Sequence, residues 1–353
     1  MVVDHICFYV SGHGFGHASR DVELIRALQR RVPDLRVTIR TMAPRWLFDG
    51  LGRSVAVEHA VVDTGMSQID SLHIDEDDTA RHAAAFYDSF DRRVAAEAGA
   101  LGRIQADLVV GDIPPLAFAA AAAAGLPSIA VGNFTWDWIY AEQESFARLA
   151  PRAIATIRDA YTKTALALRL PLHGGFDAMA AVVRDVPLIA RTSTRDPHDT
   201  RRLLGLPSDR PVVLPSFGGY GVALPWDVVA RSPRIAVIQE ADAAIARHGL
   251  RYPDLVAAAD VVVSKPGYGI VSECIANGTA LLYTSRGRFA EQDVFVREMP
   301  HMLRCRAIDQ EDLLAGRWDA GVEELLDRPM PTGRVRMDGA DVAADAIGDF
   351  LRR

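Results

Sequence analysis

The sequence predicts an α/β protein made of two doubly wound domains, each a parallel sheet covered by helices, with a ligand-binding cleft between them. Apolar strands alternate with helical segments, and three of these strands run directly into glycine-rich turns, at 11–16, 217–221 and 265–269. A length of 353 residues is sufficient for two domains. We expect an N-terminal domain at 1–186 and a C-terminal domain at 187–353, whose last helix could pack back on the first domain.

The composition is that of an ordinary soluble globular enzyme, with 49% apolar and 24% charged residues. A formal net charge of -7 offers no basic face for nucleic acid. No apolar run reaches the roughly 18 residues that a transmembrane segment needs. The start of the chain lacks the basic region of a signal peptide, so we expect a cytoplasmic location. Cys7, Cys274 and Cys305 are too few and too scattered for a disulfide framework or a zinc site.

The first strand and the turn that follows it organise the N-terminal domain. Residues 5–10 are apolar and β-prone, residues 11–20 read Ser-Gly-His-Gly-Phe-Gly-His-Ala-Ser-Arg, and helical spacing of apolar residues begins at Val22. Open α/β sheets bind ligands at such turns, and the helix N-terminus behind this one favours an anion. The turn is not a dinucleotide fingerprint, because His17 takes the third glycine position. Nor is it an ATPase phosphate loop, because no Gly-Lys-Ser/Thr follows.

The polar residues of this turn are candidates for chemistry. His13 and His17 carry the side chain that exchanges a proton near neutral pH. The alternative is a histidine at a helix start that only hydrogen-bonds the backbone. Arg20 could neutralise a phosphate, or it could pair only with Asp21 or Glu23 nearby in the sequence.

The rest of the N-terminal domain continues the alternation of strands and helices. We predict strands at 35–41, 55–62, 107–112 and 128–132, and helices near 45–52, at 80–105, at 116–124 and through 139–170. The stretch 63–80 shows no core pattern, and its acidic run at 75–78 is expected to be a solvated loop rather than a cation site.

Two strand ends in this domain carry polar or aromatic residues. Asp112 ends a buried strand just before two prolines, where it could face the ligand or cap the next helix. The strand at 128–132 ends in the segment 133–138, rich in aromatic residues. Its Trp136 and Trp138 could present a face for a sugar, or they could anchor the loop on the core.

The C-terminal domain repeats the pattern. We predict strands at 211–216, 234–238, 261–264 and 280–283, helices at 252–260 and after 269, and a mostly helical tail from 306. Two of these strands end in glycines, which allow a ligand to approach the backbone closely.

Three stretches of the chain resemble the GT-B glycosyltransferases: 12–20, 133–140 and 253–273. Within that superfamily the chain resembles the branch of the lipid-intermediate N-acetylglucosaminyltransferase of peptidoglycan synthesis, and more closely the glycosyltransferase-like N-terminal region of plant arabinokinases. The resemblance implies the GT-B fold, with two Rossmann-like domains and an interdomain cleft. The galactokinase-like domain of the arabinokinases has no counterpart in this sequence, so a sugar kinase is not expected.

The resemblance places a nucleotide sugar in the C-terminal domain. Backbone amides of two glycine turns would face the diphosphate, Glu273 would bind the ribose, and the segment that begins at Glu291 would hold the donor sugar. The donor-binding residues that it implies are Ser216, Phe217, Gly218, Gly219, Lys265, Gly267, Tyr268, Gly269, Glu273, Glu291 and Gln292.

The resemblance places the acceptor and the base in the N-terminal domain. We expect His17 to act as the general base and Asp112 to orient it, with His13 as the alternative base or an acceptor contact. The remaining acceptor-binding candidates are Gly14, Phe15, Gly16, Asn133, Trp136 and Trp138. Inversion of the anomeric centre is expected, because Leu281 stands where many retaining enzymes of this fold carry a second glutamate. No metal and no cofactor beyond the nucleotide sugar are implied.

The expected reaction is transfer of a sugar from a nucleotide-diphosphate sugar, with UDP as the family's usual nucleotide, to a hydroxyl or amine of a small molecule. The sequence leaves two alternatives: a nucleotide-sugar 2-epimerase with the same architecture, and a non-catalytic module that binds nucleotide sugars. The acceptor, the donor sugar and any oligomeric state remain open.

Overall fold

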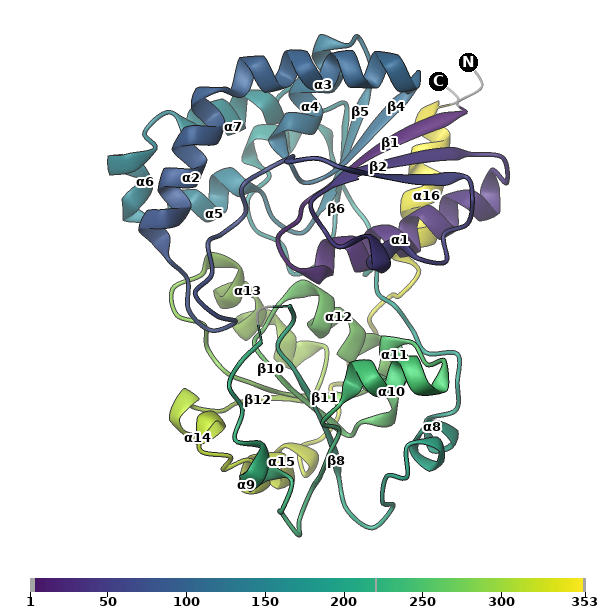
Figure 1. The fold of residues 1–353 in the computed structure, drawn as a ribbon, viewed down its shortest axis with the longest axis vertical. Coiled ribbons are helices and arrows are strands. Elements are labelled where there is room, and N and C mark those ends of the chain that lie inside the picture. Colours follow the sequence, from purple (N-terminus) through teal and green to yellow (C-terminus); the bar gives the residue numbers. More distant parts are fainter. Residues whose placement is uncertain (1–3, 220, 352–353) are drawn as a thin grey trace.

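Two parallel sheets, one in each lobe of the molecule, form its framework (Figure 1). The computed structural model describes residues 4–219 and 221–351. Within this part of the chain, the strands of the N-terminal lobe are β1 (His5–Val10), β2 (Arg36–Thr41), β3 (Val55–His59), β4 (Leu108–Asp112), β5 (Ser128–Gly132), β6 (Leu166–Arg169) and β7 (Val183–Asp185). Those of the C-terminal lobe are β8 (Val212–Ser216), β9 (Ala236–Val237), β10 (Val261–Ser264), β11 (Ala280–Tyr283) and β12 (Cys305–Ala307).

Helices surround both sheets. The N-terminal lobe contains α1 (Phe15–Arg31), η1 (Arg45–Phe48), α2 (Glu76–Asp88), α3 (Phe90–Ile104), α4 (Pro115–Ala123), α5 (Trp136–Ala141), α6 (Glu144–Leu149), α7 (Ala153–Tyr161) and η2 (Asp177–Val182). The chain continues through α8 (Pro197–Leu203), α9 (Trp226–Val229), α10 (Ala241–His248), α11 (Tyr252–Ala258), α12 (Tyr268–Asn277), α13 (Ala290–Glu298), η3 (Met299–His301), α14 (Gln310–Leu314), α15 (Asp319–Leu326) and α16 (Gly339–Leu351). Among the described residues, no helix is both long and apolar enough to cross a membrane.

The strand order creates a switch point in each lobe. The described strands of the first sheet run β3-β2-β1-β4-β5-β6-β7 and those of the second run β12-β11-β10-β8-β9, all in parallel. The chain therefore leaves β1 in one direction and returns at β4 on its other side, and β8 and β10 are related in the same way. Open α/β sheets bind ligands at such points, so the predicted fold class, two doubly wound domains, is confirmed.

The burial of β1 fits its place in the interior of the sheet, between β2 and β4. All six of its residues are buried, as expected of a strand in a parallel sheet with helices on both faces. The terminal helix α16, yellow in Figure 1, leaves the C-terminal lobe and lies beside α1 of the N-terminal lobe. Arg30 and Arg31 of α1 pair there with Asp341 of α16, at 3.0 and 2.9 Å.

Several predicted elements were wrong. Helices were expected to fill 139–170, but the last of them, α7, ends at Tyr161, and residues 166–169 form β6 because they pair with β5 in the sheet. The helix expected at 80–105 is two helices that meet at Ser89. The Ser89 hydroxyl bonds the carbonyl of Phe86, and such local bonds compete with helical ones. The strands β7 and β12 were also missed, because three residues are too short for a periodic signal.

The acidic run at 75–78 starts a helix rather than forming a loop. The side chain of Asp75 accepts a hydrogen bond from the backbone N–H of Asp78 at 2.8 Å and so caps α2. The next three acidic residues occupy the first helical turn, where the helix dipole stabilises negative charge. Aspartate is among the preferred N-cap residues, so Asp75 is itself a helix-start signal in the sequence.

The segment between β3 and α2 crosses from the N-terminal lobe to the C-terminal lobe (Figure 1). The Ser71 hydroxyl donates to the carbonyl of Phe217 at 2.5 Å, and the Ser71 N–H donates to the carbonyl of Gly221 at 3.2 Å. Leu72 is 2% exposed and packs in the apolar core of the C-terminal lobe. The expectation that 63–80 contributes nothing to a core was therefore wrong, because its partner core belongs to the other lobe.

Candidate active site

His17 and Asp112 meet at the switch point of the N-terminal sheet. His17 lies in the first turn of α1, directly after β1, and Asp112 is the last residue of β4, which pairs with β1. The Nδ1 atom of His17 lies 2.9 Å from Oδ1 of Asp112, and both side chains are buried. Asp112 does not cap α4, whose N-cap is Pro114. The strand order thus brings together two residues that lie far apart in the sequence.

Arg20 completes this cluster from the next turn of α1. Its Nε donates to Oδ2 of Asp112 at 2.6 Å, and its Nη2 donates to Oδ1 of the same carboxylate. Burial raises the pKa of Asp112, but Arg20, with a smaller contribution from His17, outweighs burial and lowers that pKa to about 2. Asp112 is therefore ionised at neutral pH. The sequence-based alternative, in which Arg20 pairs with Asp21 or Glu23, was wrong.

The ionised Asp112 fixes the proton of His17. A carboxylate can only accept, so Nδ1 of His17 must carry the hydrogen that it donates to Asp112. Nη2 of Arg20 also lies 3.0 Å from Nδ1, because both donors converge on the same carboxylate oxygen. The Nε2 atom of His17 then has a free lone pair, and it has no hydrogen-bond partner among the described residues.

His13 has the opposite tautomer. Its Nδ1 accepts a hydrogen bond from the backbone N–H of Met66 at 3.2 Å, so a neutral His13 carries its proton on Nε2. Burial, together with the nearby Arg286, His17 and Lys265, lowers the pKa of His13 well below its ordinary value. Its ring lies edge-on to Trp136, with the centroids 5.6 Å apart.

The aromatic residues proposed to contact the acceptor are held by the N-terminal core. Trp136 is fully buried, stacks on Tyr140 and donates its indole N–H to Asp63 at 3.1 Å. Trp138 is partly buried against the turn at Gly174, where an added Cβ would lie 2.3 Å from its ring. These contacts correspond to the anchoring alternative considered for both tryptophans.

The glycine turns of the two lobes touch each other. A Cβ on Gly269 would lie 2.9 Å from the Cα of Gly16, so the two backbones approach as closely as only glycines allow. Beside them the ring of Phe15 lies against Gly219, where an added Cβ would be 2.8 Å from Cζ. Gly14 is the N-cap of α1, with φ of 80°. The acceptor turn and the donor turns predicted from the sequence therefore face each other directly.

The donor turns lie at the carboxyl ends of β8 and β10. Ser216 accepts a hydrogen bond from Tyr252 at 2.5 Å, and Phe217 packs in the C-terminal core. Gly218 has φ of 71° in the first turn, and Gly267 is the N-cap of α12 in the second. The Lys265 ammonium is partly buried between them, and burial together with Arg286 lowers its pKa to about 7.

Two further residues of α12 are buried at the boundary between the lobes. The Tyr268 hydroxyl accepts a hydrogen bond from the N–H of Ile189 at 3.1 Å, and the Arg20 guanidinium lies 4.9 Å from its ring centroid. Glu273 is 2% exposed and pairs with Nε of Arg191 at 2.5 Å. A ribose would compete with Arg191 for the Glu273 carboxylate.

The segment predicted to hold the donor sugar is bound to both lobes. Glu291 accepts from Asn133 of the N-terminal lobe at 2.8 Å and from Arg286 at 3.1 Å. Gln292 accepts from the backbone N–H of Arg286 and donates to Ser285, which orders the turn before α13.

Sequence reasoning missed three charged residues in this region: Asp63, Arg191 and Arg286. Asp63 is buried beside Trp136, and burial raises its pKa. Arg286 is buried, and its Nε has no partner among the described residues. Each of them lies outside a recognisable motif. Their burial, which marks them as candidates, is visible only in the folded structure.

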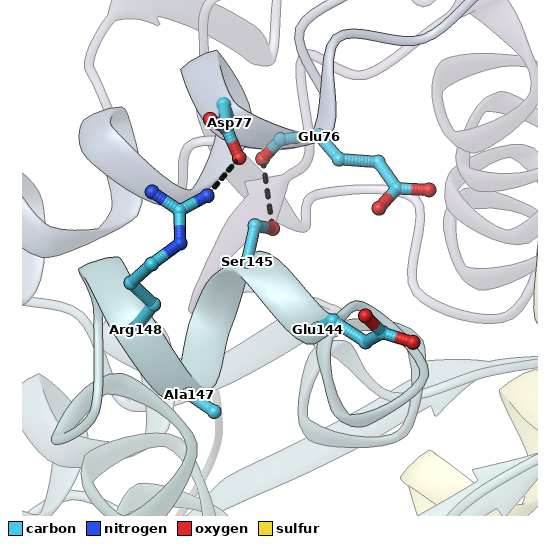
Figure 2. Close-up of a pocket in the computed structure, with 6 residues that line it drawn as sticks. All are labelled: Glu76, Asp77, Glu144, Ser145, Ala147 and Arg148. Atoms are coloured by element: carbon cyan, nitrogen blue, oxygen red, sulfur yellow. Dashed lines mark hydrogen bonds and ion pairs between the residues drawn. The ribbon is translucent and has the colours of Figure 1, made fainter.

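A separate hollow of about 530 Å³ lies at the surface between α2 and α6. Figure 2 shows its lining, in which Arg148 pairs with Asp77 and the Ser145 hydroxyl bonds the carbonyl of Glu76. It contains none of the predicted site residues. Across the described part of the chain, no group of three or more His, Cys, Asp and Glu side chains is arranged to hold a metal ion.

Comparison with solved structures identifies the fold as GT-B. A UDP-glucosyltransferase from Polygonum tinctorium capable of glucosylating indoxyl superimposes with a TM-score of 0.63 at 12% identity, covering 100% of both chains. The glycosyltransferase of kitacinnamycin gives a TM-score of 0.60 at 17% identity, over 99% of this chain and 100% of the other. A putative UDP-N-acetylglucosamine 2-epimerase from Listeria monocytogenes gives 0.56 at 11% identity, over 100% of this chain and 96% of the other. The chain therefore has the GT-B fold.

One curated protein is similar to this chain in sequence. The chain is 31% identical over 356 residues to an L-arabinokinase of Arabidopsis thaliana, an alignment that covers 96% of this chain and 34% of that protein. The chain thus spans about a third of the length of the relative that it matches. No family model matches the sequence.

Proposed function

We propose that this protein is a glycosyltransferase that moves a sugar from a nucleotide-diphosphate sugar to a hydroxyl or amine of a small molecule. One observation carries the proposal: His17, held by Asp112 at 2.9 Å, lies at one switch point, and the N-terminus of α12 lies at the other, with Gly16 and Gly269 in contact between them. A base opposite an anion-binding helix end is what glycosyl transfer from a diphosphate requires.

The chemistry assigns a role to each part. The lone pair on Nε2 of His17 takes the proton of the acceptor, whose oxygen or nitrogen attacks the anomeric carbon as the bond to the diphosphate breaks. Asp112 stabilises the imidazolium that forms. The N–H groups at the start of α12 and the Lys265 ammonium stabilise the departing nucleoside diphosphate. A single displacement of this kind inverts the anomeric centre, and it uses neither a metal nor a further cofactor.

The tautomers favour His17 over His13 as the base. His13 carries its proton on Nε2 and uses Nδ1 to accept from Met66, so neither ring nitrogen is free to take a proton without breaking that bond. His17 has its free lone pair on Nε2, as a general base needs.

The names of similar proteins guide the choice of substrates. Two of the structural neighbours are named for UDP or a UDP-sugar, which makes UDP the first nucleotide to test. The curated relative is named for L-arabinose, so arabinose belongs among the acceptors and UDP-arabinose among the donors.

A thermal-shift screen tests the donor site first, with UDP, GDP, dTDP, CDP and their sugars. A ligand at 100 times its dissociation constant stabilises the folded state by about 2.7 kcal/mol. We expect one nucleotide to raise the melting temperature, and acceptor libraries then follow with the matching sugar. If every nucleotide leaves the melting temperature unchanged, the protein does not bind a nucleotide-sugar donor.

The 2-epimerase remains a second candidate, because a putative enzyme of that kind shares the fold over the full chain. The two reactions differ in their need for an acceptor. An epimerase converts UDP-N-acetylglucosamine alone, whereas a transferase releases UDP at a useful rate only when an acceptor is added.

Replacing Glu273 by glutamine tests the ribose contact. A hydrogen bond to a charged group contributes about 1.5–3 kcal/mol, so nucleotide affinity is expected to fall by about 10- to 100-fold. Isothermal titration with the nucleotide from the screen measures this, and Glu311→Gln, at a side chain that is 88% exposed, is the control. Unchanged affinity would remove Glu273 from the donor site.

Lys265 predicts how donor binding depends on pH. Below about pH 7 its ammonium is protonated and attracts the diphosphate, and above that pH the free protein loses this charge. Affinity for UDP is therefore expected to fall by up to about tenfold per pH unit as the pH rises from 7, until the pKa of the complex is reached. Lys265→Met should abolish this slope in titrations between about pH 7 and 9. A variant that keeps the slope shows that another group is responsible.

A further inference from the structure

A continuous chain of buried polar side chains joins the two lobes at the site. It starts at His17 and passes through Asp112 and Arg20 in the N-terminal lobe. Nη1 of Arg20 donates to Oδ1 of Asn133 at 2.7 Å, and Nδ2 of Asn133 donates to Oε1 of Glu291 at 2.8 Å. Each of these five residues is at most 6% exposed, so their hydrogen-bond partners come mainly from the protein.

The two neighbours of position 133 require a side chain that both accepts and donates hydrogen bonds. Arg20 can only donate, and Glu291 accepts both here and from Arg286, so the side chain between them must accept at one end and donate at the other. An asparagine amide does both. An aspartate would face Glu291 with a second negative charge, although it would still accept from Arg20. Nδ2 of Asn133 also lies 3.4 Å from the carbonyl of Leu172 in its own lobe, so the shorter bond to Glu291, at 2.8 Å, is the stronger of the two contacts that orient the amide toward Arg20.

Other contacts between the lobes gather around the same helix start. The Arg20 guanidinium lies over the ring of Tyr268, and Gly16 touches Gly269, so α12 meets the first turns of α1 where His17 is located. If the lobes separated, Arg20 would lose its Tyr268 contact and Asn133 would lose its carboxylate partner. Asp112 would then be oriented by fewer groups.

We propose that Asn133 is a positioning residue: its amide, held by Glu291 across the lobe boundary, keeps Arg20 and Asp112 in the geometry that orients His17, so that the base is complete only when the lobes meet. This inference rests on the proposed function for the role of His17 as base. This arrangement keeps His17 from being oriented as a base while the lobes are apart and the site is exposed to water, where it would promote hydrolysis of the donor.

The test exchanges the two polar groups. Asn133→Asp is expected to lower turnover by about 10- to 100-fold, as the loss of a charge-assisted hydrogen bond implies. In the double variant Asn133→Asp/Glu291→Gln, the new aspartate accepts both from Arg20 and from the glutamine amide, whose oxygen still accepts from Arg286. At saturating donor and acceptor, the double variant is expected to turn over faster than Asn133→Asp, although position 291 also belongs to the predicted donor-sugar segment. A double variant no more active than the product of the two single effects would overturn the proposal, since a merely structural role gives no rescue.

A distance measurement separates this inference from the proposed function, because it needs no substrate. Spin labels at Arg92→Cys on α3 and Glu311→Cys on α14 report the separation of the lobes, and the native cysteines are buried. Asn133→Asp should shift the label-to-label distances to longer values, and the double variant should restore them. Unchanged distances in Asn133→Asp would overturn the coupling. If the double variant restores the distances but the protein transfers no sugar, the coupling between the lobes is supported and only the proposed transferase function is contradicted.

A second variant guards against a failure of Asn133→Asp to fold. Glu291→Ala leaves the N-terminal lobe unaltered and removes the same cross-lobe bond. It should also lengthen the distances between the two spin labels. It should lower turnover, and raising the acceptor concentration should not restore it. If Glu291→Ala holds the lobes as close as the unmodified protein does, Asn133 does not couple them.

Discussion

Replacing His17 by alanine is expected to cut turnover by about 10²–10⁴-fold, the usual contribution of a general base. The variant should bind nucleotide as tightly as the unmodified protein, because the side-chain polar contacts of His17 are made with Asp112 and Arg20 of the N-terminal lobe and not with the predicted donor-binding residues. Steady-state kinetics with the donor and acceptor found by screening measure the first quantity, and titration with the nucleotide measures the second.

Two companion variants sharpen this result. Asp112→Asn keeps the size of the side chain but presents an amide that no longer requires the proton on Nδ1 of His17, so it should also lower turnover by orders of magnitude. His82→Ala removes an exposed histidine on α2 and should leave turnover unchanged. If His17→Ala retains full turnover while Asp112→Asn does not, the base is a different residue that Asp112 serves.

Replacing Arg20 by methionine is expected to destabilise the fold by about 3–5 kcal/mol, because it leaves the Asp112 carboxylate buried without its guanidinium. The buried Asp21 lies near the same carboxylate, and burial together with the Asp112 charge raises the pKa of Asp21 well above its ordinary value. Urea unfolding at pH 7 measures the loss, and Arg26→Met, at a more exposed arginine of the same helix, should change stability by no more than about 1 kcal/mol.

The pH dependence of this loss identifies its cause. In the unmodified protein the pKa of Asp112 is depressed, so its contribution to stability is present above the pKa of the unfolded chain and is lost as the pH falls toward about 2. Without Arg20 that pKa rises, and Asp112 can bind a proton at mildly acid pH. The deficit of Arg20→Met should therefore be largest at neutral pH and shrink toward about pH 4. A deficit of equal size at both values would point to lost packing on Tyr268 instead.

Local sequence signals predicted the parts of the site that backbone geometry controls. Glycines after an apolar strand, followed by helical spacing, predicted a strand, a turn and a helix around 11–16 and around 265–269, although α1 begins at Phe15, before the helical spacing that starts at Val22. The rule that parallel strands present ligands at their carboxyl ends predicted that Asp112 could reach His17. That contact needs only the position of two strand ends in one sheet.

Short strands and the loop between the lobes escaped prediction for a common reason. β6 is a strand because β5 offers it hydrogen-bond partners, and Leu72 is a core residue because its segment crosses to the other lobe. Neither feature produces a periodic pattern of apolar residues in the local sequence, since both depend on a partner far along the chain. The same limit applies to Arg20, for which the local sequence offers a phosphate or the neighbouring Asp21 and Glu23 as partners, whereas the fold brings Asp112 to it.

The sequence by itself determined the fold class, the glycine turns and the residue types available at each strand end. The reason is that the local spacing of apolar residues and glycines reflects burial and backbone conformation. Only the tertiary structure decided which charges meet. The bond from Asn133 to Glu291 joins residues 158 positions apart in different lobes, and the pairing of Glu273 with Arg191 spans 82. A buried polar group takes whichever complementary partner the fold brings within about 3 Å, and that choice depends on the strand order and on how the lobes meet.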